Sequence, residues 1–386
     1  MIVQYRNARL VDAMGDRFGD LYMEEGVIRY CGEATKQRSD LQVDLDGRVL
    51  MPAFIDLHCH LRDPGYPAKE TMETGMRAAL KGGYAMLCAM ANTNPVISTP
   101  ELVQKNHEKA AALRLCHLTQ AAAAGENLDD SAATDYAALS KVTNMLTNDG
   151  KTIFSDAFMR NLLIASSQYG FLISTHCQPE RQIVARDIEL LREVGGNLHV
   201  GHISRAETVQ MIREAKTKGL TLTCEVTPHH LFGYDSDYKV NPPLRTKADV
   251  QALMEGIKDG TVDCLSTDHA PHTEDDKAAG MAGISNIEYA MQVFLQVFHE
   301  NGLPLTRLSE LMSFAPARRL GRKTGVLAAG YPADLVVLEP DGEYTIRRAD
   351  MISKSSNTPF EGRKVRGRVI RTIVEGEVRY DHGQTL

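Results

Sequence analysis

The chain has 386 residues, of which 43% are hydrophobic and 24% are charged, and its formal net charge is -7 at pH 7. This is ordinary globular composition, and the length leaves room for a large core divided over about two domains. An acidic chain without a stripe of Lys and Arg has no surface that could neutralise phosphates, so we expect no nucleic-acid partner.

Neither targeting signals nor disulfide bonds are expected. Arg6, Arg9 and Asp12 interrupt any apolar stretch near the N-terminus that could act as a signal peptide. No later segment has the ~18 uninterrupted apolar residues of a membrane span. The seven cysteines are an odd number spread along the chain, which is unlike a disulfide framework. The sequence therefore predicts a cytoplasmic protein with reduced thiols and no membrane partner.

The two ends of the chain share a pattern of short strands and turns. Residues 1–50 contain strand-like pieces with turns at residues 25–26 and 46–47, and residues 325–386 return to this pattern. Neither end alone offers enough strands for a stable sheet. We therefore expect both ends to pair into one composite β domain, a small β-sandwich, beside a central domain of residues 51–324.

The central domain alternates short apolar runs, typical of buried strands, with helical patterns. The first helical pattern places Met72, Met76 and Leu80 on one face and is closed by glycines at residues 82–83. Eight strand–helix units favour a (β/α)8 TIM barrel, an α/β fold. The competing fold is an open doubly wound sheet, but no glycine-rich fingerprint follows the first strand. The predicted strands are residues 54–58, 84–90, 113–119, 142–149, 170–177, 197–204, 220–226 and 262–270.

The stretch FIDLHCHLRDPG, residues 54–65, places His58 and His60 on the same face of the first predicted strand. Alone, such a pair can equally be two buried histidines bonded to backbone carbonyls. Four further strands end in polar side chains, namely Asp149, His176, His202 and Asp268. Because strand ends of a barrel open onto one face, all six side chains should converge there. Nitrogen and carboxylate ligands without thiolates suit Zn²⁺ or a similar divalent ion.

Eight motifs occur in order along nearly the whole chain: HCHLRDPG, ANTNP, TNDG, THC, GHIS, VTPHHL, VNPPLR and STDHAPH. In this order and spacing they resemble the dihydroorotases of the amidohydrolase superfamily. The resemblance is to the bacterial class with an aspartate in place of a carboxylated lysine that bridges two metals. It implies the following site: His58 and His60 on one metal, His176 and His202 on a second, Asp149 between them, and Asp268 as a metal-site residue and catalytic acid/base.

The resemblance also implies a set of substrate-binding residues. These are Arg62, Asn94 and His272 as a clamp for a substrate carboxylate, with Asn241 and the backbone near Gly283 lining the pocket. The chemistry agrees, because a planar guanidinium beside a metal matches a carboxylate in bidentate fashion. Residues 271–284, PHTEDDKAAGMAGI, are rich in Gly and small residues and predict a mobile loop over this pocket.

The implied reaction is the reversible, metal-dependent cyclisation of N-carbamoyl-L-aspartate to L-dihydroorotate in de novo pyrimidine (UMP) biosynthesis. In the hydrolytic direction, a metal-bound hydroxide attacks the ring amide, and Asp268 passes the proton to the leaving nitrogen. The implied cofactor is Zn²⁺, one or two ions per subunit. A homodimer is expected, and association with aspartate transcarbamoylase stays open.

Two other functions stay open. A related cyclic amidohydrolase, such as a dihydropyrimidinase, hydantoinase or allantoinase, would need a carboxylated lysine, for which Lys151 is the only candidate near Asp149. A non-catalytic dihydroorotase-like subunit would serve only to scaffold aspartate transcarbamoylase. The chain also departs from the family pattern beside several predicted ligands, where we expect altered metal affinity. These departures are Ala91, Thr147, Asn148, Thr175, Gln178, Pro179 and Ala282.

Overall fold

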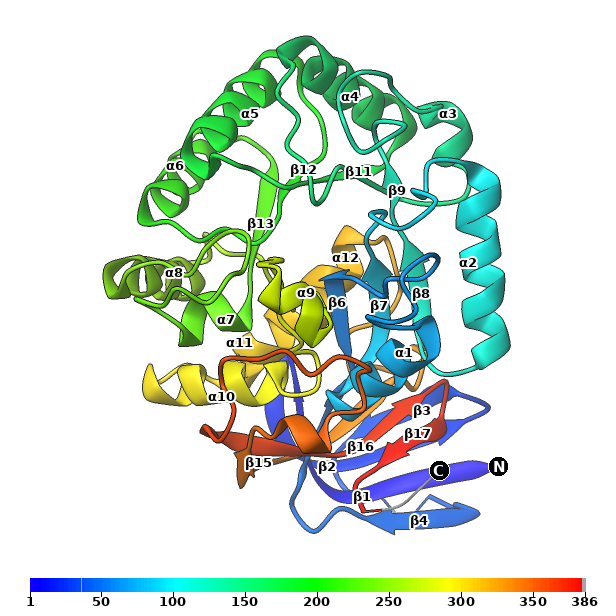
Figure 1. Ribbon diagram of the computed structural model, residues 1–386. Helices are drawn as coiled ribbons and strands as arrows, with labels where there is room; N and C mark the ends of the chain where they lie inside the picture. Colours follow the sequence, from blue (N-terminus) through cyan, green and yellow to red (C-terminus); the bar gives the residue numbers. More distant parts are fainter. Residues whose placement is uncertain (36, 384–386) are drawn as a thin grey trace.

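Strands from the two ends of the chain lie side by side in one sheet (Figure 1). The computed structural model describes residues 1–35 and 37–383. The strands of this sheet are β1 (Ile2–Asp12), β2 (Gly15–Glu24), β3 (Val27–Gly32), β4 (Leu41–Asp44), β5 (Val49–Pro52), β15 (Leu335–Thr345), β16 (Lys364–Val374) and β17 (Glu377–Asp381). They follow the order β17-β16-β15-β5-β1-β2-β3, and β4 pairs with β1.

The junction between the two ends is the antiparallel pair β5 and β15, in which Leu335 lies opposite Pro52. Buried side chains from both ends, among them Leu10, Leu21 and Ile373, form a hydrophobic cluster of their own. Apolar residues on alternate positions of a strand share one face, which explains how this cluster forms. The two ends therefore meet in one sheet, whereas their arrangement as a sandwich stays a prediction.

The central part of the chain contains two sheets of parallel strands. The first has the order β6-β7-β8 and the second the order β14-β13-β12-β11-β10-β9. Their bounds are β6 (Phe54–Cys59), β7 (Tyr84–Ala89), β8 (His117–Gln120), β9 (Ala122–Ala123), β10 (Met145–Thr147), β11 (Leu172–Thr175), β12 (Leu198–Val200), β13 (Leu222–Val226) and β14 (Cys264–Leu265). Each of the eight predicted strands thus contains or overlaps an observed one, and β9 is additional.

The two parallel sheets are connected at both of their ends. On one side only Ala121 separates β8 from β9 along the chain, and the hydroxyl of Thr143, just before β10, donates to the carbonyl of Gln120 in β8 over 2.7 Å. On the other side, Cys59 in β6 forms a parallel bridge with His269, just beyond β14. The N–H of Asp268 donates to the carbonyl of His58 over 2.9 Å at the same place. The carboxyl ends of the first and last strands are therefore neighbours.

Helices cover the outside of the parallel strands (Figure 1). They are α1 (Met72–Lys81), α2 (Pro100–Leu113), α3 (Tyr136–Leu139), α4 (Asp156–Tyr169), α5 (Glu180–Val194), α6 (Ala206–Thr217), α7 (Pro228–Phe232), α8 (Lys247–Asp259), α9 (Glu274–Ala278), α10 (Ala290–Glu300), α11 (Leu305–Ser309) and α12 (Ala315–Arg319), with a π-helix at Glu310–Phe314 and a 3-10 turn at Arg348–Asp350. Helix α8 begins at a capping box of Thr246 and Asp249 and ends at Gly260, which has a positive φ of 85°. Its buried residues Leu253 and Ile257 face the core.

The segment of residues 271–284 differs from the expected loop because it contains helix α9. Thr273 and Asp276 form a capping box at the start of α9. A capping box of this kind favours a helix, whereas the glycines of the segment favour a loop. The Lys277 ammonium donates to the carbonyls of Lys239, Met281 and Gly283. Mobility of this segment stays a prediction.

Among the described residues, the helices are all too short or too polar to cross a membrane. All seven cysteines are free, and six of them are buried. Buried thiols of this kind are inert packing residues, because burial raises their pKa values, as it does for Cys116 and Cys224.

Asp56 ties the first parallel strand to the last and gives a test of this closure. Its side chain accepts hydrogen bonds from the N–H of Thr267 over 2.9 Å, from the Thr267 hydroxyl over 2.5 Å and from the N–H of His58 over 3.2 Å. Asp56→Ala leaves these buried donors unpaired, so we expect a loss of about 2 kcal/mol in the free energy of unfolding. Urea denaturation measures it. Asp341→Ala, at an 84% exposed side chain, serves as the control and should cost less than about 0.5 kcal/mol; equal losses would refute the role of Asp56.

Candidate active site

Six buried polar residues meet at the carboxyl ends of the parallel strands. His58 lies in β6, and the others lie one to three residues beyond the ends of β6, β10, β11, β12 and β14. Their exposed fractions are 1% for His58, 4% for His60, 4% for Asp149, 5% for His176, 1% for His202 and 6% for Asp268. The strand ends that sequence inspection singled out therefore converge in one buried cluster, which we call the histidine–carboxylate cluster.

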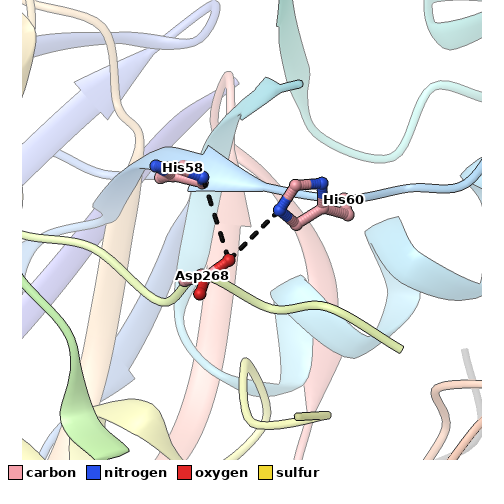
Figure 2. Close-up of side chains that lie close together, drawn as sticks. All are labelled: His58, His60 and Asp268. Carbon is pink, nitrogen blue, oxygen red and sulfur yellow. Dashed lines mark hydrogen bonds and ion pairs between the residues drawn. The ribbon is translucent and has the colours of Figure 1, made fainter. Parts of the chain in front are cut away.

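Asp268 approaches the histidine pair of the first strand (Figure 2). Its Oδ1 atom lies 3.1 Å from Nε2 of His60 and 3.8 Å from Nε2 of His58. These three residues offer ligand atoms that all lie within 4.8 Å of one another. Two imidazole nitrogens and one carboxylate oxygen at this spacing can hold one cation.

Asp149 occupies the centre of the cluster and contacts all four histidines. Its Oδ1 lies 3.3 Å from Nε2 of His58, 3.2 Å from Nε2 of His202 and 3.4 Å from Nδ1 of His176. Its Oδ2 lies 3.4 Å from Nε2 of His60. The two oxygens of this carboxylate are thus turned to different histidines, three to Oδ1 and one to Oδ2.

His58 is oriented by a buried carboxylate that sequence inspection did not single out. Its Nδ1 lies 2.8 Å from Oε1 of Glu225, in β13. Because a carboxylate only accepts, Nδ1 carries a proton, and Nε2 is the nitrogen that points into the cluster. This Nε2 is buried and faces carboxylate oxygens of Asp149 at 3.3 Å and of Asp268 at 3.8 Å without a hydrogen bond to either. A histidine that is held by a carboxylate on one nitrogen, with its other nitrogen turned to further ligand atoms, is typical of a metal ligand.

His60 is oriented in a similar way by Asn92. The Asn92 side-chain oxygen lies 2.8 Å from Nδ1 of His60, while its amide nitrogen lies 3.5 Å from Oδ2 of Asp149. Nε2 of His60 therefore presents a lone pair, and it faces Oδ1 of Asp268. A lone pair and a carboxylate oxygen attract each other only through a proton or a metal cation between them. The donor set thus fits a divalent cation.

The charges within the cluster reinforce this fit. Burial raises the pKa of Asp149, but neighbouring His58, His176 and His202 outweigh burial and hold this pKa well below its usual range. Burial also opposes ionisation of Asp268, yet His60, His58 and His202 lower its pKa. Both carboxylates are therefore anionic at neutral pH, and their charge favours a bound cation.

Arg62 and His272 touch each other beside the cluster. Nη2 of Arg62 lies 3.1 Å from Nε2 of His272, and Nε of Arg62 donates to the carbonyl of Pro271 over 3.2 Å. Burial, together with Arg62 and Lys69, lowers the pKa of His272 to about 3. The His272 ring is therefore neutral, and the positive charge belongs to Arg62 and to Lys69, whose Nζ lies 3.4 Å from Nδ1 of His272.

Gly283 packs directly against His272. A Cβ atom on Gly283 would lie 2.6 Å from Cδ2 of His272 and 2.5 Å from the carbonyl oxygen of Ala270. Its φ of +149° is also a conformation that favours glycine. The structure thus requires a glycine here for the position of the His272 ring.

The remaining two predicted pocket residues, Asn241 and Asn94, differ in their contacts with the cluster. The side-chain nitrogen of Asn241 lies 3.0 Å from Nε2 of His176, at the edge of the cluster. Asn94 is exposed, and its N–H donates to the carbonyl of Pro64 over 3.1 Å. No hydrogen bond joins Asn94 to Arg62 or His272 in the described part of the chain, so its place in a carboxylate clamp stays a prediction.

Lys151 lies apart from the cluster. Its Nζ donates to the carbonyl of Asn127 over 2.9 Å and lies 3.7 Å from Oδ2 of Asp129. Its side chain is 52% exposed. A carboxylated lysine must place its end group between the metals, and Lys151 points to a surface loop instead.

Comparison with known proteins agrees with this geometry. A sequence profile described as the amidohydrolase family matches residues 49–379. The chain is 36% identical to a dihydroorotase of Clostridium botulinum, over 97% of this chain and 98% of that protein. It is 38% identical to a dihydroorotase of Deinococcus radiodurans, over 87% of this chain and 90% of that protein.

Solved structures give the same fold at lower identity. The chain superposes with a TM-score of 0.91 on an L-hydantoinase from Arthrobacter aurescens, at 23% identity over 100% of this chain and 97% of that one. The TM-score is also 0.91 for a dihydropyrimidinase from Brevibacillus agri, at 22% identity over 100% of this chain and 96% of that one. From its profile match and its nearly full-length relatives, this chain belongs to the amidohydrolase family.

Proposed function

We propose that this protein is a dihydroorotase, which interconverts L-dihydroorotate and N-carbamoyl-L-aspartate. The observation that carries the proposal is the Arg62–His272 pair beside the histidine–carboxylate cluster. Dihydroorotate is a cyclic amide that carries a carboxylate, so it needs a hydrolytic centre and a cation next to it. The nearly full-length relatives named dihydroorotase support this assignment.

The residues that would hold the metal are those of the histidine–carboxylate cluster. We assign His58 and His60 to one position, His176 and His202 to a second, and Asp149 to both. Nitrogen and carboxylate donors favour Zn²⁺, with one or two ions per chain. A divalent ion bound there supplies Lewis acidity, which lowers the pKa of water and polarises a carbonyl group.

The side chains of the chain bind the substrate and move the proton. The Arg62 guanidinium can bind the substrate carboxylate through two parallel hydrogen bonds, and neutral His272 can complete that contact. In ring opening, water adds to the ring carbonyl, and Asp268 takes the proton from the attacking water and gives it to the leaving ring nitrogen. In ring closure, the same carboxylate takes the proton from the carbamoyl nitrogen and returns it to the departing oxygen.

The architecture around the site is part of the proposal. We assign residues 51–324 to a (β/α)8 barrel, supported by the links Thr143–Gln120 and Cys59–His269 between the two parallel sheets. Residues 1–50 and 325–386 would form the β domain. A homodimer and an association with aspartate transcarbamoylase rest on the sequence resemblance, and a cytoplasmic location rests on the N-terminal sequence and the unpaired cysteines.

The same contacts disfavour two alternative functions. A hydantoinase-like enzyme with a carboxylated lysine is disfavoured by the outward position of Lys151, although the solved neighbours share its fold. A non-catalytic scaffold has no need of four buried histidines gathered around two buried carboxylates, because such a cluster costs stability. Both alternatives are outcomes of the following tests.

Asp149 should be the bridging ligand. Asp149→Ala removes the one carboxylate that contacts all four histidines, so metal content and dihydroorotate hydrolysis should both be lost. Lys151→Ala, the matched control two residues away, should keep both, without a requirement for bicarbonate. Metal analysis and a hydrolysis assay on the two variants decide whether Asp149 or a carboxylated Lys151 is the bridging ligand. Loss of activity in Lys151→Ala that small carboxylic acids restore would support the lysine-bridged enzymes instead.

Substrate choice should depend on Arg62. A site built to pair a buried charge rejects an analogue that lacks it, so wild-type kcat/KM for dihydrouracil should be about 10⁴-fold below that for dihydroorotate. Arg62→Met keeps most of the side-chain volume without the guanidinium. It should lower kcat/KM for dihydroorotate by about 10²-fold, because charged hydrogen bonds are lost, and leave metal content unchanged.

The control for this experiment is Arg77→Met, on the exposed side of α1, which should behave like wild type. The measurement is the kcat/KM for dihydroorotate divided by the kcat/KM for dihydrouracil. This ratio should fall in Arg62→Met and stay at the wild-type value in Arg77→Met. Equal wild-type rates with dihydrouracil and dihydroorotate would contradict the proposed function.

A further inference from the structure

His229 is a buried histidine next to the histidine–carboxylate cluster that has no assigned role. It lies in α7, directly after β13, and its exposed fraction is 0%. Its Nε2 has no hydrogen-bond partner, and this atom lies 4.0 Å from Oδ2 of Asp268. A buried polar atom without a partner is costly, so its position beside the acid/base needs an explanation.

The proton position on the His229 ring follows from Asn286. The side-chain nitrogen of Asn286 donates to the carbonyl of Thr267 over 2.7 Å, which fixes the orientation of the amide. The same nitrogen lies 3.2 Å from Nδ1 of His229. Because this neighbour is a donor, Nδ1 accepts, and the proton of the neutral ring is on Nε2. The N–H of His229 therefore points toward Asp268.

The two oxygens of Asp268 have different surroundings. Oδ1 faces His60 and His58 at 3.1 and 3.8 Å, whereas Oδ2 faces His229. The distance of 4.0 Å is about 1 Å longer than a hydrogen bond, so the two groups face each other and need to approach by about that amount to form one. A carboxylate held at both oxygens cannot rotate, and its free lone pairs keep one direction toward the reacting atoms.

We propose that His229 is a positioning residue for Asp268: its Nε2–H donates to Oδ2 and fixes the carboxylate for proton transfer, while Asn286 fixes the tautomer that makes this possible. The proposal rests on the proposed function for the role of Asp268. It concerns the turnover step, because His229 acts through Asp268 and neither binds the substrate carboxylate nor belongs to the assigned metal ligands.

Two substitutions at His229 separate positioning from packing. His229→Leu fills the space without a donor, whereas the amide nitrogen of His229→Gln can replace Nε2–H. We expect His229→Leu to lower kcat for dihydroorotate hydrolysis about 10- to 100-fold, with KM and metal content close to wild type. His229→Gln should recover most of kcat. The same substitutions at exposed His299 serve as controls and should leave kcat unchanged.

A second readout does not depend on activity. Ring ¹⁵N NMR of the zinc-loaded protein, with the His229 signals identified by their loss in His229→Gln, should show a protonated Nε2 and an unprotonated Nδ1. Asn286→Ala removes the donor that selects this tautomer, so the Nε2–H signal should weaken, and kcat should fall in parallel. These spectra report on the ring itself and not on the substrate.

The outcomes are distinct. A protonated Nδ1 in the wild-type spectrum, wild-type kcat in His229→Leu, or equally low kcat in His229→Leu and His229→Gln would each overturn the positioning role. If the wild-type protein opened dihydrouracil and not dihydroorotate, only the proposed function would fail. The same kcat comparison with dihydrouracil would then test His229.

Discussion

The structure depends on one buried electrostatic arrangement, the contact of Asp149 with four histidines at 3.2 to 3.4 Å. Polar groups with exposed fractions of 6% or less cost free energy unless each has a partner or a shared cation. Asp149, together with Asp268, supplies the negative charge, and the histidine nitrogens that face these carboxylates can supply lone pairs. A divalent cation would satisfy both at the face where the carboxyl ends of the parallel strands meet.

The orientation of the ligands comes from residues outside the cluster. Glu225 fixes the tautomer of His58, and Asn92 fixes that of His60. Glu225 also contacts His199 and Ser266, so one carboxylate links three neighbouring strand ends. We propose that Asn286 and His229 orient Asp268 in the way that Glu225 orients His58. Orientation through outer hydrogen bonds is a common property of metal sites.

The cluster itself could be predicted from sequence because side-chain direction alternates along strands and strand ends share one face. The boundaries of the strands could not be predicted in the same way. The sequence predicts a third strand from residue 113, but α2 extends to Leu113 and β8 begins at His117. Glu225 and Lys69 were missed because their roles depend on contacts far away in sequence. The one signal for Glu225 in the sequence is that it is a charged residue within an otherwise uncharged strand. Helix α9 was missed because its capping box lies within a glycine-rich segment.

The central claim is that this cluster holds the metal that dihydroorotate hydrolysis requires. Its most direct test is to strip the purified protein with a chelator, add back Zn²⁺ in steps, and measure bound metal and dihydroorotate hydrolysis on the same samples. The account predicts that hydrolysis disappears on stripping and returns in proportion to bound zinc, up to one or two ions per chain. Undiminished hydrolysis by the stripped protein, or full zinc loading without hydrolysis, would contradict it.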